Sequence, residues 1–149
     1  MAGSGPHAPV SVLHVEDDTA LSASVALLLR TAGYISRAVA SGDEALAWID
    51  HRTHDPDVLI VDFELPGELH GGDVAQEIFR ALGRAIPTIM LSGQLTEITP
   101  PWMPGAPLLC VWKPVDPDVL LKAVEVFAIF GRFVRKRSGR PGERSALRR

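Results

Sequence analysis

Five short apolar runs, separated by segments with helical spacing, constrain the fold of this chain more than any other feature. The run VLIVD, residues 58–62, shows the pattern: four consecutive apolar residues lead directly into a carboxylate. Runs that are apolar at every position predict strands buried on both faces, which require a parallel sheet covered by helices on both sides. We therefore expect an α/β, doubly wound fold with a five-stranded parallel sheet. The expected strands are Val10–Val15, Tyr34–Val39, Asp57–Val61, Pro87–Leu91 and Pro107–Trp112.

Helical segments are expected between these strands. Apolar residues at helical spacing predict a first helix that begins after Asp18 or Thr19 and ends at Gly33. After the fourth strand, four prolines within residues 93–107 disfavour a regular helix, so we expect this fourth helix to be short or irregular, with one turn near Leu95–Thr99. The other expected helices are 41–51, 72–82 and a last one from Asp116–Pro117 to about Lys136.

Charge is unevenly distributed along the 149 residues. Residues 131–149 contain eight basic residues and one acidic residue, whereas the rest contains seven basic and 17 acidic residues. The chain after Val134 has too few apolar residues to build a core. We expect a flexible N-terminus over 1–9, one domain over 10–136, and a solvated, disordered basic tail over 137–149, with no output domain. Binding of the tail to nucleic acid is the less favoured interpretation.

The sequence shows no sign of export or of cysteine chemistry. No apolar run approaches the ~18 residues of a membrane span, and the N-terminus lacks the pattern of a secretory signal, so we expect a cytoplasmic protein. The single cysteine, Cys110, excludes an intrachain disulfide and is expected to be a buried, small apolar side chain. We expect His14 to be a hydrogen-bonded core histidine and His70 to be a solvated side chain.

Polar side chains follow four of the five expected strands. Glu16 and Asp17 follow the first, Asp62 the third, Ser92 the fourth and Lys113 the fifth. The carboxyl ends of parallel strands meet at one edge of a sheet, so these groups are expected to converge. Clustered carboxylates repel one another, and Mg²⁺ with its preference for oxygen ligands removes that repulsion. With an added ammonium and hydroxyl group, the pattern predicts a phosphoryl-transfer site with a carboxylate nucleophile.

The motifs HVEDD, VDFELPG, TIMLSG and VWKP occur in this order, each at an expected strand end. Together they resemble the receiver domains of bacterial two-component response regulators, over about residues 10–130. The resemblance implies a flavodoxin-like (βα)5 sandwich. It also implies a single-domain response regulator that receives phosphate from a histidine kinase or phosphotransfer protein and signals by conformational switching and protein contact.

The resemblance implies a role for each strand-end side chain. Asp62 would accept the phosphoryl group, Ser92 would sense it and Lys113 would contact it, with Pro114 following in a cis peptide bond. The Mg²⁺ ligands would be Glu16 (through water), Asp17, Asp62 and the backbone carbonyl of Glu64.

Two departures from the family pattern leave an alternative open. Cys110 stands where the family usually has an aromatic residue, and residues 93–107 are rich in proline. A degenerate receiver that acts as an interaction or dimerisation module without phosphorylation would show such departures. A phosphatase of the haloacid dehalogenase type would need a second aspartate where this chain has Glu64. We therefore expect that this protein is a phosphoacceptor and not an enzyme, apart from slow autodephosphorylation.

The last expected helix is apolar over more than one face. One side would cover the sheet, and the remaining apolar residues favour a partner surface or a homodimer through this helix. One side of the helix is expected to carry Val119, Leu120, Val124, Phe127, Phe130 and Val134, and the apolar surface is extended by Val126, Ile129 and Phe133. The homodimer contact would include Val126, Phe130 and Phe133.

Overall fold

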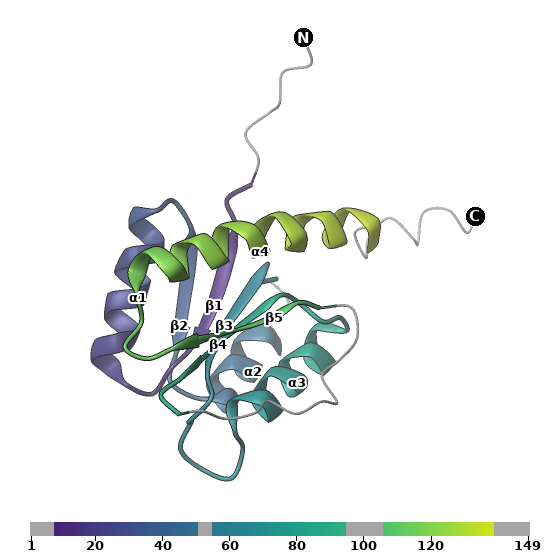
Figure 1. The fold of residues 1–149 in the computed structure, drawn as a ribbon. Helices are drawn as coiled ribbons and strands as arrows, with labels where there is room; N and C mark the ends of the chain where they lie inside the picture. Colours follow the sequence, from purple (N-terminus) through teal and green to yellow (C-terminus); the bar gives the residue numbers. More distant parts are fainter. Residues whose placement is uncertain (1–7, 51–54, 95–105, 139–149) are drawn as a thin grey trace, which may run out of the picture.

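The computed structural model describes residues 8–50, 55–94 and 106–138, and it contains one five-stranded sheet (Figure 1). All paired strands are parallel, and their order is β2-β1-β3-β4-β5. The expected doubly wound α/β fold is therefore confirmed, and each expected strand is found within one residue of its predicted bounds. The strands are β1 Ser11–Val15, β2 Ile35–Val39, β3 Val58–Asp62, β4 Thr88–Ser92 and β5 Leu108–Trp112.

Helices cover both faces of this sheet (Figure 1). The Asp18 side chain caps the first helix by accepting hydrogen bonds from the backbone amides of Ala20 and Leu21, both at 3.0 Å. The third helix ends at Gly83, whose φ of 72° is the left-handed conformation that glycine adopts without strain. In the described residues the helices are α1 Thr19–Thr31, α2 Gly42–Asp50, α3 Gly71–Leu82 and α4 Pro117–Ser138.

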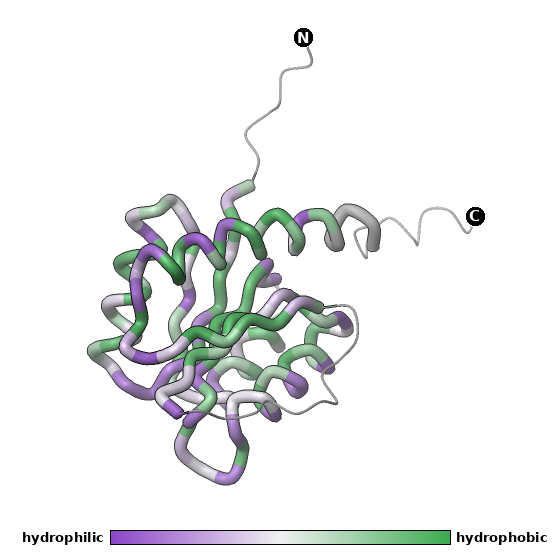
Figure 2. Tube along the Cα trace, viewed as in Figure 1, coloured by the Kyte–Doolittle hydropathy of each residue, from purple (hydrophilic) through white to green (hydrophobic). Residues whose placement is uncertain are grey.

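The core consists of two apolar layers, one on each side of the sheet. The central strands between these layers are hydrophobic along most of their length (Figure 2). Alternate residues of β1 divide between them: Leu13 packs in the layer beneath α2 and α3, and Val12 packs in the layer beneath α1 and α4. The central strands β3 and β4 are buried at every position, as their continuous apolar sequence predicts. Burial on both faces fixes the direction and register of the strands whose ends carry polar groups.

Several expectations lie outside the described residues. These are the short turn near Leu95–Thr99, most of the N-terminal segment and the basic tail beyond Ser138. Among the described helices, none is long and apolar enough to cross a membrane.

The expectation for Cys110 was wrong, because this residue is exposed. It lies on β5, which is an edge strand of the sheet and has a neighbouring strand on one side only. On α4, Val119 is 49% exposed and Phe130 is 37% exposed, so neither belongs to the buried side of this helix. The buried side of α4 is formed instead by Leu120 and Val124 together with small alanines.

His14 is a core residue, but it is not hydrogen-bonded as expected. Its side chain is fully buried, and neither ring nitrogen has a hydrogen-bond partner in the described part of the chain. Burial lowers the pKa of His14 to about 4; the nearby Asp62 carboxylate opposes this effect and the Lys113 ammonium adds to it. The folded protein therefore holds a neutral imidazole at neutral pH.

The glycine pair that begins α3 provides a test of packing beside β3. A Cβ on Gly71 would lie 2.2 Å from the carbonyl oxygen of Asp62, whereas a Cβ on Gly72 would meet nothing within 4 Å. We expect Gly71→Ala to lower the free energy of unfolding by about 1–3 kcal/mol, since backbone must move. Gly72→Ala should be neutral or slightly stabilising. Urea denaturation of both variants measures the difference, and equal midpoints would contradict the close approach.

His14 predicts an acid-dependent stability. The pKa is 6.5 in the unfolded chain and about 4 in the folded protein, so between these values the unfolded chain binds the additional proton. The free energy of unfolding should therefore fall, by up to about 3 kcal/mol, as the pH decreases from about 6.5 to about 4. His14→Leu should remove this contribution, and His70→Leu, which alters an exposed ring, should retain it. Thermal denaturation as a function of pH checks this; identical profiles for His14→Leu and the unmodified protein would refute it.

Candidate functional site

The predicted strand-end residues meet at one edge of the sheet. The Nζ of Lys113, which follows β5, lies 2.8 Å from Oδ2 of Asp62 at the end of β3 and 3.8 Å from Oε2 of Glu16 after β1. Asp62 and Glu16 are each only 2% exposed. The peptide bond between Lys113 and Pro114 is cis, as the resemblance implies. Three separate chain segments thus contribute charged groups to one partly enclosed cluster.

Asp62 is held as an ion by its hydrogen bonds. Burial alone would raise the pKa of this carboxyl group. The hydrogen bond from Lys113, the neighbouring Glu16 and the backbone amide of Glu64, which donates to Oδ1 at 3.0 Å, together bring the pKa below its usual value. In turn, burial would lower the pKa of Lys113, but the contact with Asp62 raises it. The pair is therefore an ionised carboxylate beside an ammonium group.

Glu16 is the least satisfied acid of the cluster. Its Oε1 accepts a hydrogen bond from the Asp18 amide at 3.2 Å, but its buried Oε2 has no hydrogen-bond partner in the described residues. Burial and the adjacent Asp62 raise the pKa of Glu16 to about 7. The Lys113 ammonium lies 3.8 Å from this Oε2, and a second cation closer to Glu16 would reduce the repulsion and provide a partner for the oxygen.

Glu16, Asp17 and Asp62 form a set of oxygen donors that fits a hard divalent cation. Each offers one carboxylate oxygen, and these oxygens lie within 4.8 Å of one another. Asp17 is exposed and so leaves one side accessible to water. An all-oxygen set that is open to solvent suits Mg²⁺, which commonly keeps several waters beside one or two carboxylates. The side chain of Glu64 is not a member of this set and is instead hydrogen-bonded to Ser92 and Gly93, which is compatible with the predicted use of its backbone carbonyl alone.

The side chain of Glu64 has a role that the sequence did not indicate. Its Oε1 accepts a hydrogen bond from the hydroxyl group of Ser92 at 2.7 Å. The backbone amide of Gly93 lies 3.1 Å from Oε1 and 3.2 Å from Oε2. Nothing in the sequence specifies this, because residue types after a strand do not determine which way a flexible side chain turns.

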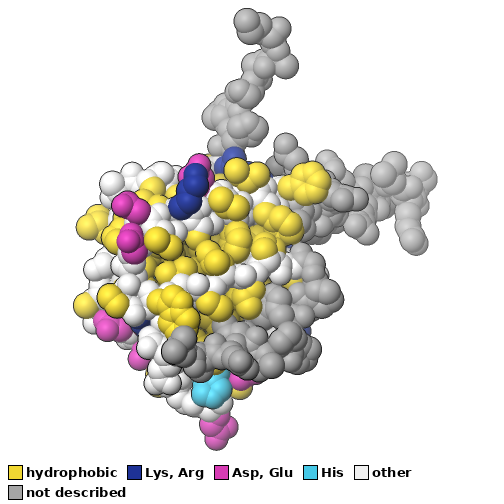
Figure 3. All heavy atoms as spheres, in the orientation of Figure 1, with side chains coloured by type: hydrophobic (Ala, Val, Ile, Leu, Met, Phe, Trp, Pro, Cys, Tyr) yellow, Lys and Arg dark blue, Asp and Glu magenta, His cyan; other side chains and the backbone are white. Residues whose placement is uncertain are grey.

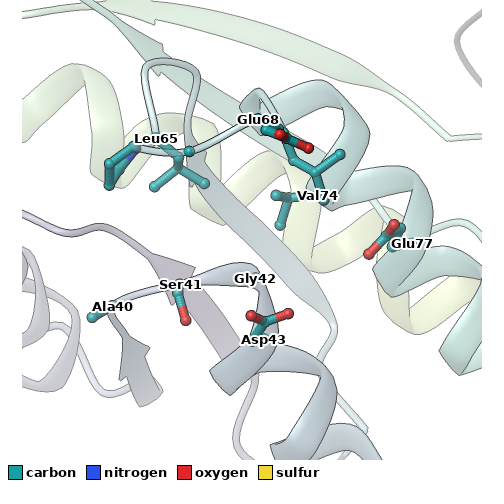
Figure 4. Close-up of a pocket in the computed structure, with 11 residues that line it drawn as sticks. Ala40, Ser41, Gly42, Asp43, Leu65, Glu68, Val74 and Glu77 are labelled. Carbon is teal, nitrogen blue, oxygen red and sulfur yellow. The ribbon is translucent and has the colours of Figure 1, made fainter.

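A hollow of about 190 Å³ lies between the β2–α2 turn and the β3–α3 loop (Figure 4). Asp43 on α2 lies across it from Glu68 in the loop and Glu77 on α3. None of the predicted site residues lines it. The groups suited to phosphoryl transfer therefore belong to the strand-end cluster and not to this hollow.

Comparison with known proteins agrees with this arrangement. The family model described as "Response regulator receiver domain" matches residues 12–125. The sensory transduction protein RegX3 of Mycobacterium tuberculosis is 38% identical over 88 residues, which are 59% of this chain and 37% of that protein. RegX3 of Mycolicibacterium smegmatis is 36% identical over the same length. The chain thus matches little more than a third of the length of these curated relatives.

Two solved structures share the fold at higher coverage. A putative response regulator from Chloroflexus aurantiacus is 31% identical with a TM-score of 0.67, covering 82% of this chain and 99% of that one. The chemotaxis protein CheY4 of Vibrio cholerae is 27% identical with a TM-score of 0.64, covering 80% of this chain and 99% of that one. Because the family match extends from the first strand into the last helix, this chain belongs to the response regulator receiver domains of two-component signalling.

Proposed function

We propose that this protein is a cytoplasmic phosphoacceptor that receives a phosphoryl group on Asp62 from a histidine kinase or a phosphotransfer protein. The observation that carries the proposal is the contact of 2.8 Å between Lys113 and the buried Asp62 carboxylate, beside two further acids. A nucleophilic carboxylate, a cation and a set of oxygen donors are the parts that phosphoryl transfer requires.

The transfer can be described through the residues of this chain. An oxygen of Asp62 forms a bond to phosphorus while the bond between phosphorus and the donor histidine nitrogen breaks, and that nitrogen takes up a proton. Lys113 keeps Asp62 ionised before the reaction and lies close enough to neutralise charge on the product acyl phosphate. Ser92, at the end of the neighbouring strand, supplies a hydroxyl group that can donate to a phosphoryl oxygen and draw its loop toward the site.

Glu16, Asp17 and Asp62, with the backbone carbonyl of Glu64, would hold Mg²⁺. The ion supplies charge neutralisation for the phosphoryl oxygens. The burial of Glu16 beside Asp62 supports a further cation at this position, since its Oε2 has no hydrogen bond in the described residues and lies 3.8 Å from the Lys113 ammonium.

The exposed apolar side of α4 supports a homodimer as a further part of the proposal. Apolar side chains gather over α4 and β5 on the face shown in Figure 3. On α4, Val126 is 52% exposed, Ile129 is 69% exposed and Phe133 is 59% exposed. These residues recur at helical spacing and form one stripe, which a second copy of the same helix could cover.

Phosphorylation of Asp62 can be tested with a small-molecule donor. After incubation with acetyl phosphate and Mg²⁺, intact mass spectrometry should detect one phosphoryl adduct, since the carboxylate is ionised and its charge is compensated. Asp62→Asn should abolish the adduct, whereas Asp43→Asn, which alters an exposed carboxylate on α2, should retain it. Removal of Mg²⁺ with EDTA should reduce the rate at least tenfold, as for loss of one charge-stabilising partner.

The same experiment tests the alternative of a receiver that acts without phosphorylation. If the folded protein forms no adduct on Asp62, even with saturating Mg²⁺ and a mixture of histidine kinases as donors, the interaction module is the better description. An adduct that persists in Asp62→Asn would place the acceptor elsewhere and overturn the assignment.

The homodimer can be tested by charge substitution on α4. We expect the combined change Val126→Glu and Phe133→Glu to leave a monomer at concentrations where the unmodified protein is a dimer, because two carboxylates per chain would face apolar surface. Leu27→Glu is the matched control, since Leu27 is 62% exposed on α1. Sedimentation velocity before and after treatment with acetyl phosphate measures the state. A monomeric unmodified protein under both conditions would rule out the dimer.

A further inference from the structure

The carboxylate of Glu64 lies at the end of β4, where it accepts hydrogen bonds from the Ser92 hydroxyl group and the Gly93 amide. Ser92 Oγ is 2.7 Å from Oε1, and the Gly93 amide lies 3.1 Å and 3.2 Å from the two oxygens. Ser92 is only 5% exposed, whereas Glu64 is half-buried and Gly93 is exposed, so the contact is partly shielded from water at its Ser92 end. Hydrogen bonds to a carboxylate in such surroundings are stronger than those between neutral groups.

The position of Glu64 is fixed by the phosphoacceptor itself. The backbone amide of Glu64 donates to Oδ1 of Asp62 at 3.0 Å, which holds the start of the β3–α3 loop against the strand end. From this anchored backbone the side chain spans the gap between β3 and β4. The two ends of Glu64 thus connect the nucleophile with the hydroxyl group of Ser92.

A phosphoryl group on Asp62 would need the same donors. A hydroxyl group has a single proton to donate, so Ser92 cannot serve the Glu64 carboxylate and a phosphoryl oxygen at once. In the structure Ser92 Oγ also lies 2.9 Å from the carbonyl oxygen of Gln94, which adds a second acceptor for that proton.

We propose that the carboxylate of Glu64 is an internal competitor of the phosphoryl group, and that phosphorylation displaces it from Ser92 and Gly93. This inference rests on the proposed function, since it concerns the same site. Glu64 is a positioning residue: it holds the end of β4 in the unphosphorylated arrangement and opposes the phosphorylated one. Its release is then part of the switch, because Ser92 and Gly93 lose a charged acceptor when the phosphoryl group takes over the hydroxyl group.

The competition can be measured with beryllofluoride, a noncovalent analogue of a phosphoryl group, in saturating Mg²⁺. We expect the dissociation constant to decrease roughly tenfold in Glu64→Ala, as for removal of one charged competitor of two hydrogen-bond donors. Glu64→Gln should lie between, because an amide oxygen accepts the same hydrogen bonds without the charge. Glu68→Ala is the matched control: it removes an exposed carboxylate from the same loop and should leave the constant unchanged.

A second measurement reports on the contact directly. In the protein without beryllofluoride, the amide proton resonance of Gly93 should move upfield in Glu64→Ala, since that amide loses its charged acceptor, and should stay in place in Glu68→Ala. A general loosening of the fold would instead shift resonances throughout the sheet. Circular dichroism confirms that each variant is folded before the constants are compared.

The outcomes separate this inference from the proposed function. An unmodified protein that binds beryllofluoride with the same constant as Glu64→Ala overturns the competition and leaves the phosphoacceptor assignment intact. A Gly93 resonance that does not move in Glu64→Ala overturns the contact. Failure of beryllofluoride to bind, together with absence of an acetyl phosphate adduct in every variant, overturns the proposed function and the inference with it. Binding that appears only in the Glu64 variants supports the competition in its strongest form.

Discussion

The contact between Lys113 and Asp62 is the interaction on which the rest of this site depends. A carboxylate that is 2% exposed is costly unless a partner compensates its charge, and the ammonium at 2.8 Å does so. The same lysine lies 3.8 Å from Glu16, so one cation is shared between two buried acids, with Asp17 nearby. One positive charge among three acids leaves the cluster with a net negative charge. That imbalance is the physical basis for expecting a divalent ion. Burial, together with the adjacent Asp62, raises the pKa of Glu16.

The parallel sheet makes this contact possible between residues that are 51 positions apart. The ladder continues past the strand ends, where the Lys113 amide donates to the Ser92 carbonyl and the Phe63 amide donates to the Leu91 carbonyl, both at 2.8 Å. These bonds hold the residues after β3 and β5 at the same level as the end of β4. On the other side of the nucleophile, Gly71 packs so closely against the carbonyl of Asp62 that no side chain fits. The position of the nucleophile is thus set by backbone on both sides.

The fold and the cluster could be predicted because both follow from short, local signals. Continuous apolar runs indicate strands buried on both faces, and parallel strands bring the residues after them to one edge, so Asp17, Asp62 and Lys113 were placed together from the sequence alone. The predictions that were wrong depend on solvent exposure or on side-chain surroundings at individual positions. Cys110 was expected to be buried because it lies in an apolar run, but an edge strand has no neighbour on one side. His14 was expected to find a hydrogen-bond partner, and no sequence pattern states which groups surround a buried ring.

The direction of the Glu64 side chain is likewise not determined by the sequence, and it changes how the switch is understood. In the structure these donors at the sheet edge already have anionic acceptors: Lys113 donates to Asp62, and Ser92 and Gly93 donate to Glu64. If phosphorylation displaces Glu64 as proposed, Ser92 and Gly93 exchange one anionic partner for another and do not gain an additional one. An exchange of one anion for another yields a smaller net free energy than a new set of hydrogen bonds, so the two arrangements remain close in free energy. A receiver with a small difference between its two states responds to a single charged group, which is the property that a reversible signal requires.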